Sequence, residues 1–140
     1  MSALRRRQRL TEASVYRYIN RCRKEIRACE SARAYLAGII LCGTALEYTL
    51  TAWIRAFDVP RVGRRRLTER WDLKHLIDRA YETRWFDYKA FRSAERIRKF
   101  RNLVHPNWYA GRKPIRFTKY ILANRREDLG TVVDSLYRNL

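Results

Sequence analysis

Residues 34–57 read AYLAGIILCGTALEYTLTAWIRAF, and this stretch decides the fold. Of its 24 residues 17 are hydrophobic, and its only charges are Glu47 and Arg55. A helix that is apolar on every side is buried in a core or lies in a membrane. An acid deep in a membrane costs roughly 3 kcal/mol, so Glu47 favours the core and we expect no membrane contact. Residues 32–57 are therefore predicted to form the buried central helix of a bundle, with Gly38 and Gly43 marking close approaches of neighbouring helices.

Apolar residues recur at helical spacing on both sides of this stretch, which predicts further helices. These are expected over residues 11–29, 71–81, about 87–105 and 118–140, with Asp87 as an N-cap and Gly130 dividing the last one. Five Gly and three Pro leave few turns for a many-stranded sandwich or barrel. The sequence thus predicts an all-α bundle of four to six helices, with a basic mobile arm over residues 1–10 and a single domain over residues 11–140.

The chain is strongly basic. It carries 32 Lys and Arg against 14 Asp and Glu, a formal charge of +18, and 26 of the basic residues are Arg. Guanidinium groups match phosphate oxygens, and neutralised phosphates release counterions, so the partner expected is RNA or DNA. The plainer alternative is a basic soluble protein. The segment 61–70 holds five Arg, among them Arg64, Arg65 and Arg66, which we expect to contact nucleic acid.

The spacing of Cys22, Cys29 and Cys42 fits no zinc pattern, so these residues are expected to pack in the core. The start of the chain has no secretory signal pattern, which indicates the reducing cytoplasm. Only two His are present, which argues against a metal hydrolase, and we expect neither a metal nor another cofactor.

Residues 96–106 read RIRKFRNLVHP and are the best candidate for chemistry. Arg98, Arg101, Asn102 and His105 stand at i, i+3, i+4 and i+7, so they share one side of a helix. Imidazole can take up and return a proton near pH 7, and guanidinium can stabilise charge growing on phosphorus. No metal is needed if the substrate brings its own nucleophile, as the 2′-hydroxyl of RNA does.

A structural interpretation of the same residues stays open. His105 can cap the carbonyls at a helix end, and an Arg beside a core can pair with an acid. Glu47 needs such a partner inside the apolar helix, and we expect it to meet Arg98, Arg101 or His105.

Three segments resemble prokaryotic HEPN-type proteins (higher eukaryotes and prokaryotes nucleotide-binding). Residues 31–47 (SARAYLAGIILCGTALE) resemble their central helix, residues 73–80 (LKHLIDRA) the short helix that follows, and residues 101–106 (RNLVHP) their Arg-Asn…His signature. The likeness covers about residues 30–106. It implies a helical bundle, a metal-independent ribonuclease of toxin–antitoxin or antiphage-defence systems with a cognate antitoxin, and a site formed across a homodimer.

The family's pattern has four to six residues between its Arg and its His. Three residues separate Arg101 from His105 and six separate Arg98 from it, so either Arg can be the functional one. Inactive members exist, so the alternative is a non-catalytic RNA- or DNA-binding or antitoxin-like module. A two-fold axis would supply one His105 as base and another as acid, which independently favours a homodimer.

Aromatic and basic residues follow the candidate site. Trp108 and Tyr109 can stack an unpaired base beside Arg112 and Lys113, or they can cover the end of the bundle. His75 is interpreted as a surface residue. A third interpretation of the basic surface is an acidic polypeptide partner.

Overall fold

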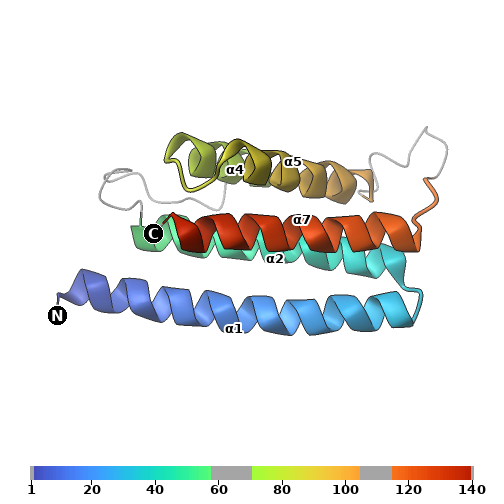
Figure 1. Cartoon of the computed structure of the whole chain (residues 1–140), viewed down its shortest axis with the longest axis horizontal. Coiled ribbons are helices and arrows are strands. Elements are labelled where there is room, and N and C mark those ends of the chain that lie inside the picture. The colour runs from blue at the N-terminus through green and yellow to red at the C-terminus, as the bar shows by residue number, and fades with distance from the viewer. Residues whose placement is uncertain (1, 58–70, 105–114, 140) are drawn as a thin grey trace.

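A computed structural model describes residues 2–57, 71–104 and 115–139, and it is a helical bundle in these ranges. The helices are α1 (Ala3–Ser31), α2 (Tyr35–Phe57), α4 (Leu73–Glu82), α5 (Tyr88–Leu103) and α7 (Lys119–Arg138). They lie along one long axis, with α1 on one side, α2 and α7 in the middle, and α4 and α5 on the other side (Figure 1). The prediction of a small all-α bundle is confirmed.

Helix α2 is the centre of the bundle, because it contacts α1, α4, α5 and α7. By length and composition it could cross a membrane, but 56% of its most apolar stretch is buried inside the protein. The burial is not complete, because Leu36, Ile40 and Tyr48 form a stripe in which each residue is 40 to 44% exposed. The central helix expected to be buried on every side therefore keeps one partly exposed face.

The glycines of α2 are the sites of two close helix contacts. A Cβ atom at Gly38 would lie 2.5 Å from a methyl carbon of Leu122 in α7, and one at Gly43 would lie 2.7 Å from Cδ of Arg101 in α5. Both neighbours fit because glycine has no side chain, as the sequence predicted. Gly130, in contrast, does not divide α7, which runs unbroken to Arg138. Packing of the buried residues on both sides of Gly130 outweighs its helix-propensity penalty of about 1 kcal/mol.

The expected basic arm is replaced by helix. Helix α1 begins at Ala3, and the Ser2 hydroxyl accepts a hydrogen bond from the backbone N–H of Arg5 at 3.2 Å. Residues 3–10 read ALRRRQRL and contain only strong helix formers, so they extend a helix that later residues have already nucleated. The first helix is consequently longer at both ends than the predicted range 11–29.

The cysteines pack as expected. Cys22 and Cys42 are buried, Cys29 is partly buried, and all three are free thiols. Burial raises the pKa of the Cys42 thiol to about 12.

Candidate functional site

The last turns of α5 carry the candidate catalytic arginines. The side chain of Arg101 crosses Gly43 and reaches α2, where its Nη2 lies 2.8 Å from Oε2 of Glu47. The expectation that Glu47 pairs with Arg98, Arg101 or His105 is confirmed, with Arg101 as the partner. The two side chains are 36% and 39% exposed, so solvent and a ligand can reach the pair.

Arg98 is held by a different carboxylate. Its Nη2 and Nε donate to the two oxygens of Glu95, one turn earlier in α5, at 2.8 and 3.2 Å. These hydrogen bonds hold the pKa of Arg98 above its usual value, and the nearby carboxylates of Asp78 and Asp72 contribute to the same shift. Arg98 thus lies within the field of the acids of α4, whereas Arg101 is bound to α2.

The other candidates are only partly placed. Asn102 is partly buried in the last turn of α5, and the helix ends at Leu103. The remaining predicted site residues lie outside the described residues: His105, Arg64, Arg65, Arg66, Trp108, Tyr109, Arg112 and Lys113. The structure therefore brings Arg101 to Glu47 and describes no contact of His105.

His75 is a surface residue, as the sequence predicted. Its side chain is 66% exposed, and Nδ1 lies 2.6 Å from Oδ1 of Asp72, the N-cap of α4. The same carboxylate accepts the backbone N–H of His75 at 2.9 Å, and these bonds hold the pKa of Asp72 below its usual value. The histidine completes a helix cap at this position.

A buried ionic cluster between α5 and α7 was missed from the sequence. Asp128 accepts hydrogen bonds from Nε of Arg125 and from Nη2 of Arg96, each at 2.9 Å. Arg96 also donates to the Ser93 hydroxyl at 3.1 Å, and the guanidinium of Arg125 lies 4.4 Å from the centre of the Phe100 ring. Arg125 and Asp128 are each 7% exposed, so this cluster fixes α5 against α7 and thereby fixes the base of the candidate site. Their i, i+3 spacing was the one signal in the sequence.

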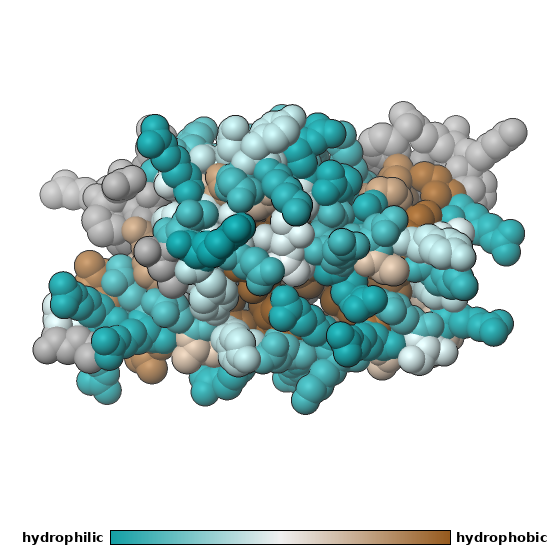
Figure 2. Space-filling model, in the orientation of Figure 1, coloured by the Kyte–Doolittle hydropathy of each residue, from teal (hydrophilic) through white to brown (hydrophobic). Residues whose placement is uncertain are grey.

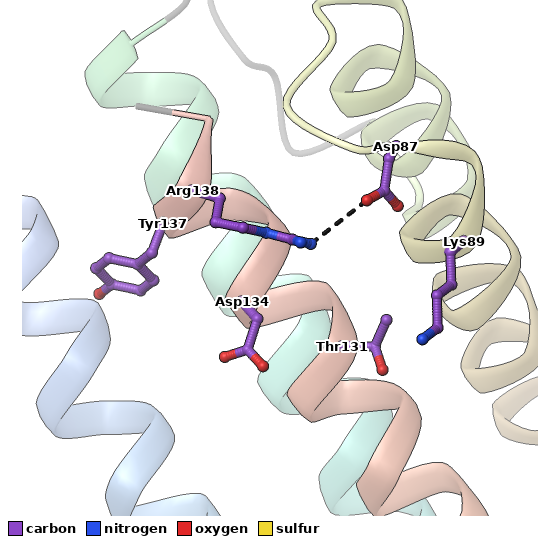
Figure 3. A pocket seen from close by; sticks show the side chains of 6 residues that line it. All are labelled: Asp87, Lys89, Thr131, Asp134, Tyr137 and Arg138. Atoms are coloured by element: carbon purple, nitrogen blue, oxygen red, sulfur yellow. Dashed lines mark hydrogen bonds and ion pairs between the residues drawn. The ribbon is translucent and has the colours of Figure 1, made fainter.

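Among the surface grooves lined by described residues, the α5/α7 groove has balanced charge. It measures about 620 Å³ and carries Asp87 and Asp134 against Lys89 and Arg138. Arg138 is bound to Asp87 at 3.4 Å, and Tyr137 points away from the others toward α1 (Figure 3). A groove without net charge is poorly suited to a polyanion.

The other two grooves are basic and lie beside α1. The α1/α7 groove, of about 450 Å³, is lined by one acid, Glu127, and by Arg23, Arg27 and Arg126, the last held by Glu30 at 2.6 Å. The α1/α2 groove, of about 370 Å³, includes Arg7, Thr11, Glu47, Tyr48, Thr51 and Arg55.

Among the described helices, the excess of basic residues is largest on α1 and α5. Lys and Arg outnumber acids by nine to three within residues 3–31 and by six to one within residues 88–103. Hydrophilic side chains cover most of the face seen in Figure 2, including the edge formed by α1. Within the described ranges no three His, Cys, Asp or Glu side chains are grouped so that they could hold a metal ion.

Comparison of the chain with protein-family models, with curated proteins and with solved structures found no match. The HEPN-like resemblance of the sequence therefore stays a prediction.

Proposed function

We propose that this protein binds RNA and cleaves it without a metal, at a site formed by the carboxyl end of α5. The observation that carries the proposal is the position of Arg101. Its guanidinium is held by a partly exposed carboxylate, Glu47 of α2. Arg101 itself lies in the last turn of α5, which ends at Leu103, two residues before His105 in the sequence. The excess of Arg on α1 and α5 supplies the long-range attraction that draws a polyanion to the bundle.

Each residue has a role in the proposed reaction. The ribose 2′-hydroxyl attacks the adjacent phosphorus, the bond to the 5′-oxygen breaks, and a 2′,3′-cyclic phosphate is left. His105 takes the proton from the 2′-hydroxyl or returns one to the leaving oxygen, so a homodimer would supply both functions. Arg101 or Arg98 stabilises the charge on phosphorus, and Asn102 orients the phosphate. We propose the cytoplasm as the compartment and a cognate antitoxin as a further partner.

A non-catalytic RNA- or DNA-binding module is the second candidate, and the ion pairs favour it. Arg98 and Arg101 are each bound to a carboxylate at 2.8 Å, which neutralises much of the charge that a transition state would need. For cleavage, the phosphate must replace Glu47 or Glu95. Glu95 is 18% exposed and Glu47 is 39% exposed, so the exchange is easier at Arg101.

A time course of labelled RNA in excess chelator separates these candidates. If the nuclease proposal is right, the wild-type protein leaves 2′,3′-cyclic phosphate ends and His105→Ala abolishes cleavage. The matched control is His75→Ala, which removes the other histidine of the chain and should cleave at the wild-type rate.

Three outcomes contradict the nuclease proposal in different ways. Cleavage that persists in His105→Ala rules out this site. Binding of intact RNA with steep salt dependence but no cleavage supports the binding module. Weak binding to all nucleic acids contradicts both candidates and favours an acidic polypeptide partner.

A further inference from the structure

The α1/α2 groove presents two guanidinium groups from two helices. Arg7 comes from the second turn of α1 and Arg55 from the last turn of α2, and both line the groove. Neither has an acidic partner within residues 2–57, 71–104 and 115–139. The one acid of the groove, Glu47, is engaged by Arg101. The groove therefore keeps an excess of unneutralised positive charge.

This arrangement suits a phosphate group. Two guanidinium groups on opposite walls can each donate to phosphate oxygens, and Thr51 adds a hydroxyl. The hydroxyl of Thr11 donates to the carbonyl of Arg7 at 3.0 Å, so its oxygen can only accept a further hydrogen bond. A volume of about 370 Å³ lies at the small end of the range for ligand pockets, which favours a unit the size of one nucleotide.

An aromatic side chain lies in the same groove. Tyr48 is 40% exposed, and its ring centre lies 4.0 Å from that of Tyr18 in α1. The contact with Tyr18 restrains the Tyr48 ring while leaving part of it open to solvent. Unpaired bases stack on such rings, each contributing about 1–3 kcal/mol.

We infer that the α1/α2 groove binds one nucleotide of single-stranded RNA, with its phosphate between Arg7 and Arg55 and its base against Tyr48. The inference rests on the proposed RNA binding and gives the strand a path. Glu47 belongs both to the groove and to the ion pair with Arg101, so a strand held in the groove lies beside the end of α5. The same groove would hold one nucleotide of the bound strand whether or not the protein cleaves it.

The test uses a short, fluorescein-labelled 2′-O-methyl oligouridylate, which lacks the attacking hydroxyl and cannot be cleaved by that route. Binding is measured by fluorescence anisotropy over a range of salt concentrations. Arg7→Gln/Arg55→Gln should weaken binding by about tenfold or more, because two charge-assisted hydrogen-bonding groups are lost. The slope of log K against log salt should fall by about 0.7, because the one phosphate held between the two arginines is no longer neutralised and each neutralised phosphate on a single strand contributes roughly 0.7.

The matched control is Arg17→Gln/Arg92→Gln, which removes two exposed arginines outside all three grooves. It changes the net charge equally and should weaken binding by no more than about threefold, since arginines that line no groove and contact no phosphate act only through screened attraction. Equal losses in both double variants would overturn the inference while leaving RNA binding intact. A wild-type protein that does not bind the oligouridylate would contradict the proposed function itself.

Variants of Tyr48 distinguish a nucleotide from a bare phosphate. Tyr48→Leu should weaken oligouridylate binding about fivefold or more but leave the binding of inorganic tripolyphosphate unchanged, whereas Tyr48→Phe should keep both. If Tyr48→Leu binds the oligouridylate as well as the wild type does, the groove is a site for phosphate alone and the nucleotide assignment is wrong. Circular dichroism of each variant confirms that it is folded.

Discussion

Gly43→Ala should destabilise the protein even though alanine is the better helix former. The new Cβ would lie 2.7 Å from Cδ, 3.0 Å from Cγ and 3.2 Å from Cβ of Arg101. These atoms belong to the inner part of the side chain, so they cannot swing clear unless α5 also moves. Overpacking of this kind costs about 1–3 kcal/mol, and helix propensity returns about 1 kcal/mol. With an overpacking cost in the upper half of its range, the free energy of unfolding falls by a net amount of about 1–2 kcal/mol.

Thermal unfolding with matched glycine variants measures this loss. A chain of 140 residues has an unfolding entropy of about 0.3 kcal/mol/K, so the midpoint should fall by about 3–7 °C. The control is Gly130→Ala, because the atom nearest to its new Cβ is Nη2 of Arg23 at an ordinary 3.8 Å. There the propensity gain acts alone, and the midpoint should rise by about 3 °C.

A double-mutant cycle assigns the penalty to Arg101. Arg101→Ala removes Cγ and Cδ, so Gly43→Ala should lose most of its effect in that background, with a coupling of about 1–2 kcal/mol. Two results would refute the placement of Arg101 across Gly43. One is that Gly43→Ala stabilises the protein as much as Gly130→Ala does; the other is that Gly43→Ala lowers the free energy of unfolding equally in the wild-type and Arg101→Ala backgrounds. In that case the Arg101–Glu47 pair could no longer serve as the anchor of the candidate site.

Two further predictions concern stability. Asp128→Ala leaves Arg125 buried without its carboxylate and should lower the free energy of unfolding by about 3 kcal/mol. The control Glu25→Ala breaks an exposed pair with Arg21 and should change the free energy of unfolding by less than about 0.5 kcal/mol. Urea unfolding of both variants measures the difference. Burial raises the pKa values of Cys42 and Tyr18 to about 12, so the unfolded chain loses these protons first and the free energy of unfolding should fall as pH rises from about 9 to 12. Urea unfolding across that pH range should show a smaller fall in the free energy of unfolding for Cys42→Ala/Tyr18→Phe than for the wild type. An equal fall in both proteins would contradict the raised pKa values of these two groups.

The helices were predictable because their signals are local. The apolar run from Ala34 to Phe57 predicts the length of α2 to within a few residues, and Asp87 stands where an N-cap should. The Arg101–Glu47 pair was expected because a buried carboxylate requires a partner. The structure has the pair but leaves the Glu47 side chain 39% exposed, so the partner was predicted although the full burial was not.

Relations between helices were harder to predict. Arg98 and Arg101 share one helix side, yet the rotation of about 60° between i and i+3 gives them different carboxylates. The contact of Arg96 with Asp128 depends on the axial offset between the packed helices α5 and α7, which no local sequence pattern encodes. The exposed stripe of α2 likewise depends on how many helices surround it, not on its own composition.

The first turns of α1 have a thermodynamic consequence. Residues 3–7 are exposed, so these turns have few tertiary contacts to hold them, and their amide protons should exchange with solvent at nearly the rate of a free peptide. A ligand that binds Arg7 must hold the first turns of α1 in the helical conformation, so part of the binding free energy is spent on ordering their backbone. The measured affinity would then understate the strength of the contacts. Slower amide exchange over residues 3–10 in the ligand-bound protein than in the free protein would show that binding orders these turns.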